Sequence, residues 1–185
     1  MGIVCISDPL RPGISGVLDE LRGLGFERII MLTGDNARTA ARIAAEADID
    51  EFCADMLPEA KHAYLEELRA TGHKVVMVGD GVNDTPALAL ADVGIAMGDG
   101  AAIAREVADI TLSGDDVRAL CDLRRMSTAF ISRMAQSSRF AIGFNTAVLA
   151  LGIFGVITPT LSSAAHNIST VALSIGNARR YLPET

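Results

Sequence analysis

The feature that most constrains this chain is a run of 18 residues without a charged side chain, Phe140–Ile157 (FAIGFNTAVLALGIFGVI). As an α-helix the run would be about 27 Å long, close to the thickness of the hydrocarbon core of a bilayer. A helix buried in a protein core would show the same lack of charge, and this alternative stays open. The run favours a transmembrane helix.

A second uncharged run, Leu161–Ala178, follows the break at Thr158-Pro159-Thr160 and is rich in Ser, Thr, Asn and His. Such side chains suit contact with other helices better than contact with lipid. Arginines flank the pair of runs on both sides: Arg124, Arg125, Arg133 and Arg139 before it, and Arg179 and Arg180 after it. Because basic flanks stay on the cytoplasmic side, we expect a multi-pass hairpin in the plasma or inner membrane. Both chain termini would lie in the cytoplasm.

The residues before this hairpin alternate between two kinds of segment. Five short apolar runs predict strands, at residues 2–7, 28–32, 74–78, 93–97 and 108–112. Helix-like stretches lie between the first strands, at residues 14–25, 37–47 and 59–70. This alternation predicts an α/β fold with a doubly wound, mostly parallel sheet. Ligands of such a sheet bind beyond the carboxyl ends of the strands.

Composition narrows the class of partner. The net charge of −7 excludes nucleic acid as an expected partner, because a phosphate backbone requires a face rich in Lys and Arg. The three cysteines, Cys5, Cys53 and Cys121, are too far apart to form a CxxC pair. They are typical of reduced core residues, and we expect no structural zinc site.

Two polar segments follow predicted strands. Thr33-Gly34-Asp35 offers a hydroxyl and open backbone N–H groups just before a helix, as a phosphate pocket requires. A simple turn with Asp or Asn as the helix N-cap is the alternative. Gly79-Asp80-Gly81-Val82-Asn83-Asp84 is more specific, since two carboxylates near a phosphate pocket commonly hold Mg²⁺. An Asp/Asn-Gly turn without a metal is its alternative.

Three further residues are weaker candidates. Lys61 lies on the predicted third helix, where a lone lysine is usually solvated, and only its neighbours make it a phosphate ligand. Asp8 and Arg11, in Asp8-Pro9-Leu10-Arg11, follow the first predicted strand directly. Arg11 would contact phosphate or pair with a carboxylate.

The string GDGVNDTPALALADVGIAMG, residues 79–98, closely resembles the hinge motif of P-type ATPases. DPLR (residues 8–11), MLTGDN (31–36) and LPEAK (57–61) occur in the order and spacing of that family. The apolar run followed by Asn-Ala-Arg-Arg is similar to the heavy-metal branch. The resemblance covers essentially the whole chain and implies three parts. They are a part of a haloacid-dehalogenase-type phosphorylation domain (1–120, an incomplete fold), a linking helix (121–139) and two transmembrane helices (140–182).

The resemblance also implies roles for the candidate residues. In that family ATP phosphorylates an aspartate, and the aspartyl phosphate is then hydrolysed. Asp80 and Asp84 would coordinate Mg²⁺, and Asn83 would complete the metal and phosphate shell. Thr33, Gly34 and Asp35 would contact the phosphoryl group, while Lys61 would balance its charge. Four residues would help to bind the cofactors: Asp8, Arg11, Gly79 and Gly81.

The chain departs from the family pattern in what it lacks. No DKTGT occurs, so the phosphorylated aspartate is missing, and so are the nucleotide-binding domain, the actuator domain with its TGE loop and the CPC-type helix. We therefore expect a fragment, a split gene product or a remnant. It would be inactive alone and would depend on the remainder of a pump, whose nucleotide domain binds most of the ATP.

The last helix carries the sequence information on the transported ion. His166 and Thr170 share a face, and Asn145 lies in the preceding span. Polar groups at membrane depth commonly line an ion path, although hydrogen bonding between helices would explain them equally. The copper-type Met-x-x-Ser-Ser pattern is absent, and His-Asn-x-Ser-Thr is closer to branches that handle divalent zinc, cobalt, cadmium or manganese.

Two other functions remain open at this point. A soluble phosphatase of the same superfamily would share the TGD and GDGxND-like motifs, but it needs a nucleophilic aspartate in a DxDx[TV] pattern. After the first predicted strand the chain offers only Asp8-Pro9-Leu10-Arg11. The third alternative is a non-catalytic fragment that associates with a pump.

Overall fold

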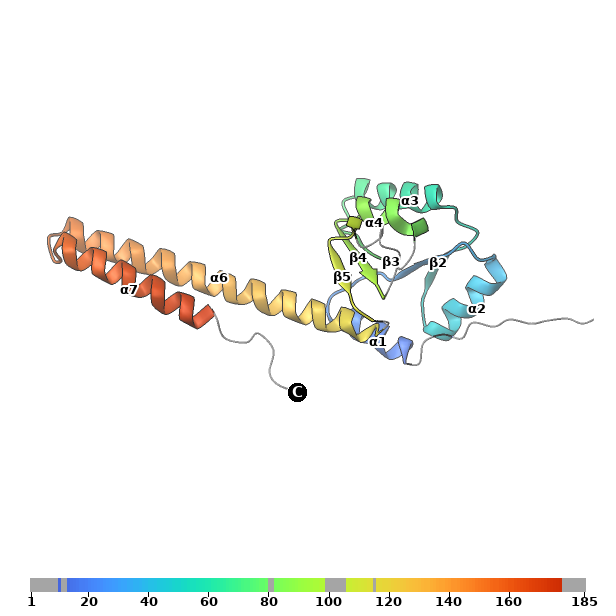
Figure 1. The fold of residues 1–185 in the computed structure, drawn as a ribbon, viewed down its shortest axis with the longest axis horizontal. Coiled ribbons are helices and arrows are strands. Elements are labelled where there is room, and N and C mark those ends of the chain that lie inside the picture. Colours follow the sequence, from blue (N-terminus) through green and yellow to red (C-terminus); the bar gives the residue numbers. More distant parts are fainter. Residues whose placement is uncertain (1–9, 11–12, 80–81, 99–105, 115, 178–185) are drawn as a thin grey trace, which may run out of the picture. The chain divides into compact units, whose positions relative to one another are not determined.

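A computed structural model of the chain describes residues 10, 13–79, 82–98, 106–114 and 116–177 (Figure 1). The chain divides into two compact units, Met1–Cys121 and Asp122–Thr185, which we describe separately. Asp8, Arg11, Asp80 and Gly81, and the strand expected at residues 2–7, lie outside the described residues.

Parallel strands and helices alternate in the first unit. The strands are β1 (Ile30–Leu32), β2 (Glu51–Cys53), β3 (Val76–Gly79), β4 (Val93–Met97) and β5 (Ile110–Leu112). The main helices are α1 (Ile14–Gly23), α2 (Ala37–Ala47), α3 (Pro58–Ala70) and α4 (Thr85–Leu90), with a single 3-10 turn, η1 (Val82–Asp84), before α4. The pairs β1–β2, β3–β4 and β4–β5 are all parallel, which confirms the predicted α/β class.

The strands form two sheets, where the sequence predicted one. Within the described residues, β1 and β2 make a two-stranded sheet, and β3, β4 and β5 make a three-stranded sheet in that order. The strand β2 and the helix α4 were not predicted. Glu51-Phe52-Cys53 is too short to show a strand pattern, and α4 begins at Thr85, directly after the segment Gly79–Asp84 that we had interpreted as a ligand loop.

Local signals explain α2, whose predicted range the structure reproduces. The side chain of Asn36 accepts a hydrogen bond from the Thr39 backbone N–H at 3.0 Å, so it caps the first turn. Ala40, Ala44 and Ala47 recur at helical spacing and are buried. The helix ends at Asp48, which adopts a left-handed conformation with φ of 60°.

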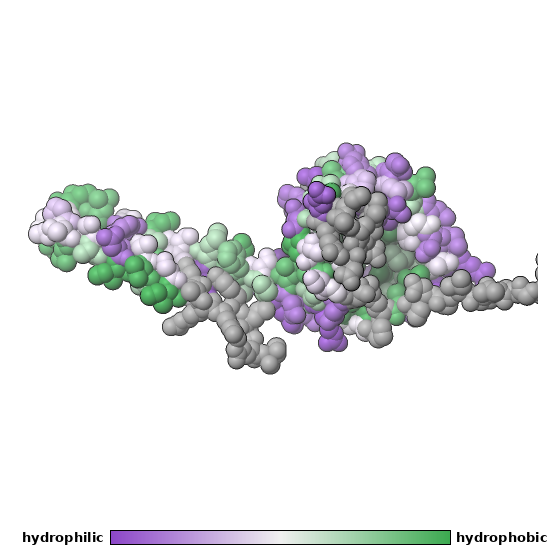
Figure 2. Space-filling model, in the orientation of Figure 1, coloured by the Kyte–Doolittle hydropathy of each residue, from purple (hydrophilic) through white to green (hydrophobic). Residues whose placement is uncertain are grey.

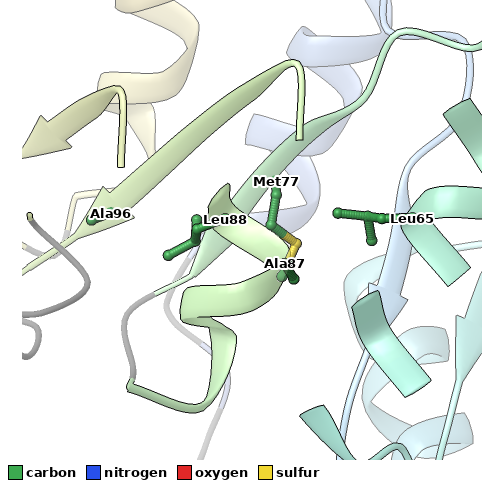
Figure 3. Packing of buried hydrophobic residues seen from close by; sticks show 5 residues of the cluster. All are labelled: Leu65, Met77, Ala87, Leu88 and Ala96. Carbon is green, nitrogen blue, oxygen red and sulfur yellow. The ribbon is translucent and has the colours of Figure 1, made fainter. Parts of the chain in front are cut away.

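One hydrophobic core joins α3, α4 and the three-stranded sheet (Figure 3). Its buried members are Leu65, Met77, Ala87, Leu88 and Ala96. Leu65 approaches from α3 and Met77 from β3, and the two side chains point toward each other beside Ala87 (Figure 3). Leu32, at the end of β1, packs against the same cluster. The strands β1 and β3 therefore contact one core although they belong to separate sheets.

The start of β3 is fixed by Asp92. This carboxylate accepts hydrogen bonds from the Val75 backbone N–H at 3.0 Å and from Lys74 Nζ at 2.9 Å. Arg69 Nε lies 3.6 Å from it. The hydrogen bond from Lys74, followed by the one from Val75, lowers the pKa of Asp92 below its ordinary value. Asp92 therefore has its oxygens committed to the protein framework.

The second unit holds most of α6 (Arg118–Ile153) and all of α7 (Pro159–Asn177). The uncharged run 140–157 therefore continues for four residues beyond the end of α6. Within the described part of the chain, no helix combines the length and hydrophobicity that a membrane crossing needs. Many large apolar side chains of this unit are nevertheless exposed, among them Ile142, Leu149, Ile153 and Phe154 (Figure 2).

Candidate functional site

The loop after β1 is held by backbone hydrogen bonds to the last residue of β2 and to the segment that follows it. The N–H of Thr33 donates to Cys53 O at 3.0 Å, and Thr33 O accepts from the Met56 N–H at 3.0 Å. Asp35 O accepts from the N–H of Asp55 at 2.8 Å. Gly34 is exposed at the tip of this loop. The predicted phosphate loop is therefore a fixed turn and not a free strand end.

The side chains of this loop also contact each other. Thr33 Oγ1 donates to Asp35 Oδ2 at 3.2 Å and accepts from the Asp35 N–H at 3.1 Å. Asn36 caps α2, as the simple-turn alternative had it. The cap uses the Asn36 side chain and leaves Gly34 exposed, so both interpretations of the loop remain compatible with its geometry.

Lys61 and Asp84 form the second part of the site. Lys61 Nζ lies 2.6 Å from Asp84 Oδ1, and the two side chains are only 13% and 16% exposed. Pro58, the first residue of α3, sets the start of the helix that carries Lys61. An ion pair shielded from water is stronger than a surface pair, because there is less solvent to screen it. Lys61 is thus a partner of the acidic motif and not a solvated lysine.

Gly79 allows this approach. A Cβ atom placed on Gly79 would stand 3.0 Å from both Cβ and Oδ2 of Asp84, and 3.4 Å from its Cγ. A larger residue at the end of β3 would therefore push the Asp84 carboxylate away from the strand. The family resemblance implied a part for Gly79 in cofactor binding, which stays a prediction; in the structure this glycine makes room for Asp84.

The chemistry of Asp84 fits Mg²⁺, which takes one or two carboxylates as ligands and retains several waters. Oδ1 pairs with Lys61, while Oδ2 lies against Gly79. Asn83, the preceding residue, is exposed. In the described part of the chain no three His, Cys, Asp or Glu side chains gather as a metal cluster.

The two parts of the site are joined by packing. Among the described residues, no hydrogen bond or ion pair connects Thr33 or Asp35 with Lys61 or Asp84. Leu32, directly before Thr33, packs on the core cluster that includes Met77 of β3. The structure thus brings Lys61, Gly79 and Asp84 into contact, and it places the Thr33 loop on the same core.

Sequence reasoning missed the residues that support the site. Cys53, Asp55 and Met56 act through backbone atoms, so no side-chain pattern reveals them. The hydroxyl of Thr85, directly after Asp84, is buried and has no hydrogen-bond partner among the described residues. Only its place beside the acidic motif would have drawn attention to it.

The third group of candidates lies in the second unit. His166 Nδ1 is 3.0 Å from Asn145 Oδ1, so α7 contacts α6 through two of the three predicted residues. Thr170 Oγ1 donates to the His166 carbonyl at 3.0 Å and so bonds to the backbone of its own helix. An open hollow of about 500 Å³ lies beside this pair, lined by Asn145, Val148, Leu149, Pro159, Ser162, Ser163 and His166.

Residues 1–92 match the family model of haloacid dehalogenase-like hydrolases. The chain is 41% identical over 180 residues to a manganese-exporting P-type ATPase of Mycobacterium tuberculosis. It is 39% identical over 178 residues to a copper-exporting P-type ATPase of Bacillus subtilis. These matches cover 97% and 96% of the chain but only 25% and 22% of the two relatives. The chain therefore spans about a quarter of the length of its curated relatives.

The fold comparison agrees with the sequence comparison. The chain is similar to the crystal structure of a zinc-transporting PIB-type ATPase in the E2.Pi state, with a TM-score of 0.88 and 36% identity. That match covers 95% of this chain and 28% of the other. The names of these three similar proteins thus include three different metals: manganese, copper and zinc. By sequence and by fold, the homologues of this chain are heavy-metal-transporting P-type ATPases, which it resembles over nearly its whole length.

Proposed function

We propose that the chain is part of an ATP-driven heavy-metal pump, to which it contributes phosphoryl-group handling and the last helical pair. The observation that carries this proposal is the shielded contact of 2.6 Å between Lys61 and Asp84 beside Gly79. A positive and a negative group held together at a strand end suit a site that stabilises moving phosphate charge.

In the proposed cycle an aspartate of the remaining pump attacks the γ-phosphoryl group of ATP, and ADP leaves. Water later attacks the aspartyl phosphate and releases inorganic phosphate. Lys61 would neutralise the phosphoryl oxygens, and the Thr33 hydroxyl and the exposed Gly34 would help to orient them. Mg²⁺, held by Asp84 together with Asp80, would supply further positive charge at the phosphate. Asn83, Asp35, Asp8, Arg11 and Gly81 keep the supporting roles implied by the family resemblance.

We further propose a divalent transition metal as the transported ion. The two relatives are a manganese-exporting and a copper-exporting ATPase, and the similar solved structure is that of a zinc-transporting ATPase. In the chain, His166 lies at a hollow between α6 and α7. An imidazole binds such ions, whereas Ser, Thr and Asn side chains bind them poorly. His166 would therefore be the main ligand that this chain contributes, with Thr170 as a neighbour on the same helix.

We propose that residues 140–182 insert into a membrane as a hairpin. The main observation in support of this proposal is the exposure of apolar side chains on α6 and α7. Reporter fusions after Thr185 and at Pro159 are expected to lie on opposite sides of the membrane, with the Thr185 fusion in the cytoplasm. Recovery of the whole chain in the soluble fraction without detergent would contradict this proposal.

A direct test of the catalytic proposal uses the 185-residue chain alone. We expect no acid-stable label after incubation with γ-labelled ATP and Mg²⁺, because the sequence holds no DKTGT aspartate. Mixing the chain with a membrane fraction that supplies the missing domains is expected to yield label only on the DKTGT-bearing chain. Hydroxylamine-sensitive label on this chain would overturn the proposal. Turnover of p-nitrophenyl phosphate by the chain alone would favour the phosphatase alternative.

A further inference from the structure

The ring of His166 has one side-chain contact that bears on metal binding. Its Nδ1 lies 3.0 Å from Asn145 Oδ1, across the two helices of the second unit. We propose that Asn145 is a positioning residue: it holds His166 as the Nδ1–H tautomer and thereby presents the Nε2 lone pair to a divalent transition metal ion. This inference rests on the proposed function and assigns Asn145 a role other than that of a ligand.

The tautomer follows from the atoms in contact. A carboxamide oxygen only accepts hydrogen bonds, so the nitrogen that faces it must carry the proton. A neutral imidazole has a single N–H, and Nε2 is then left with a lone pair. Metal-binding histidines generally donate their other N–H to an oxygen in this way, which fixes the ring orientation and raises the basicity of the ligating nitrogen.

The nearby hydroxyl groups of α7 do not compete for this role. Ser169 Oγ and Thr170 Oγ1 both donate to the backbone carbonyl of His166, at 2.8 and 3.0 Å. Ser174 Oγ donates to the carbonyl of Thr170 at 2.9 Å. These side chains satisfy their own helix, so within the described residues the His166 ring is oriented from α6, by Asn145.

The surroundings of the pair suit ion capture. The hollow beside it has apolar walls, Val148, Leu149 and Pro159, and two hydroxyl-bearing residues, Ser162 and Ser163. An amide oxygen is a weak ligand for a transition metal, and the oxygen of Asn145 is already used by Nδ1–H. The stronger arrangement is therefore one in which imidazole binds the ion and the amide orients the imidazole.

The test measures the tautomer and the metal affinity separately, on the full chain in detergent micelles. Ring ¹⁵N chemical shifts report the tautomer without metal, and the His166→Ala variant assigns the His166 signals among the three histidines. Titration with Co²⁺, followed by visible absorption, measures metal binding. The affinity assigned to His166 is that of the binding component that the His166→Ala variant lacks. The variants are Asn145→Leu, which deletes the acceptor, and Asn145→Asp, which keeps it. Asn167→Leu is the matched control on an exposed asparagine beside His166.

Asn145→Leu is expected to shift His166 toward the Nε2–H tautomer and to weaken Co²⁺ binding by about 10–100-fold. Asn145→Asp is expected to retain the wild-type tautomer, and Asn167→Leu to retain both tautomer and affinity. Unchanged ¹⁵N shifts in the Asn145→Leu variant would overturn the inference. If the same variant also bound Co²⁺ more weakly, Asn145 would be a direct ligand of the metal. If His166→Ala binds Co²⁺ like the wild type, the proposed ion site itself fails, whatever the tautomer.

Discussion

Replacing Lys61 by methionine is expected to reduce phosphoenzyme formation by about 10²–10³-fold in a pump that contains this chain. Methionine has about the length of lysine but carries no charge, so the change removes electrostatic stabilisation with little loss of packing. In the structure the ammonium group of Lys61 lies 2.6 Å from Asp84 and is largely shielded from water. The charge therefore acts where solvent screens it least.

The measurement is the rate of acid-stable label formation from γ-labelled ATP in membranes that hold the complete pump. Lys74→Met is the matched control, because Lys74 is the only other lysine of the chain. It pairs with Asp92 through a side chain that is 87% exposed. We expect the control to keep a rate within a few-fold of the wild type. Equal losses in the two variants would show that Lys61 acts on folding and not on phosphoryl transfer.

A second substitution at position 61 separates the effect of the charge from the effect of the side-chain shape. Lys61→Arg keeps the positive charge and is expected to recover part of the rate, although the guanidinium group is larger and planar. Asp84→Asn is expected to slow the reaction as well, and to weaken any dependence on Mg²⁺. If Lys61→Arg is as slow as Lys61→Met, the geometry of the ammonium group matters more than its charge.

The sequence predicted the framework of the first unit where its local signals were strong. The helix α2 was predicted with its observed limits because Asn36 caps it and three alanines repeat at helical spacing. The strand β4, Val93–Met97, was likewise predicted residue for residue from a continuous apolar run. Strand β2 has three residues and no periodicity, so only its pairing with β1 defines it.

The candidate site was predicted less completely, because part of it depends on tertiary contacts. A lysine on a helix gives no local sign that it will meet Asp84, which lies 23 residues away. The reason for glycine at position 79 is also invisible in one sequence, since it is the nearby Asp84 side chain that excludes a Cβ. The contact of Asn145 with His166 similarly requires the packing of α6 against α7.

Replacing Gly94 by alanine is expected to destabilise the first unit by about 3 kcal/mol. A Cβ atom at this position in β4 would lie 2.5 Å from the carbonyl oxygen of Leu88 and 3.1 Å from its carbon. Both are backbone atoms of α4, and the side chain of Leu88 is itself fully buried, so neither neighbour can rotate away. The backbone N–H of Gly94 also donates to Asp109 Oδ2 at 2.9 Å, which limits movement of the strand.

Thermal unfolding of the full chain in detergent, followed by circular dichroism, measures the effect. A loss of about 3 kcal/mol corresponds to a decrease in Tm of about 6–12 °C for a chain of this size. The control is Gly16→Ala in α1, where the position is exposed and an added Cβ meets nothing within 4 Å. Because alanine favours a helix interior over glycine, this control is expected to keep or raise the Tm. A Gly94→Ala variant as stable as the wild type would mean that α4 does not pack on β4 as described, and the position of Asp84 directly before α4 would then be in doubt as well.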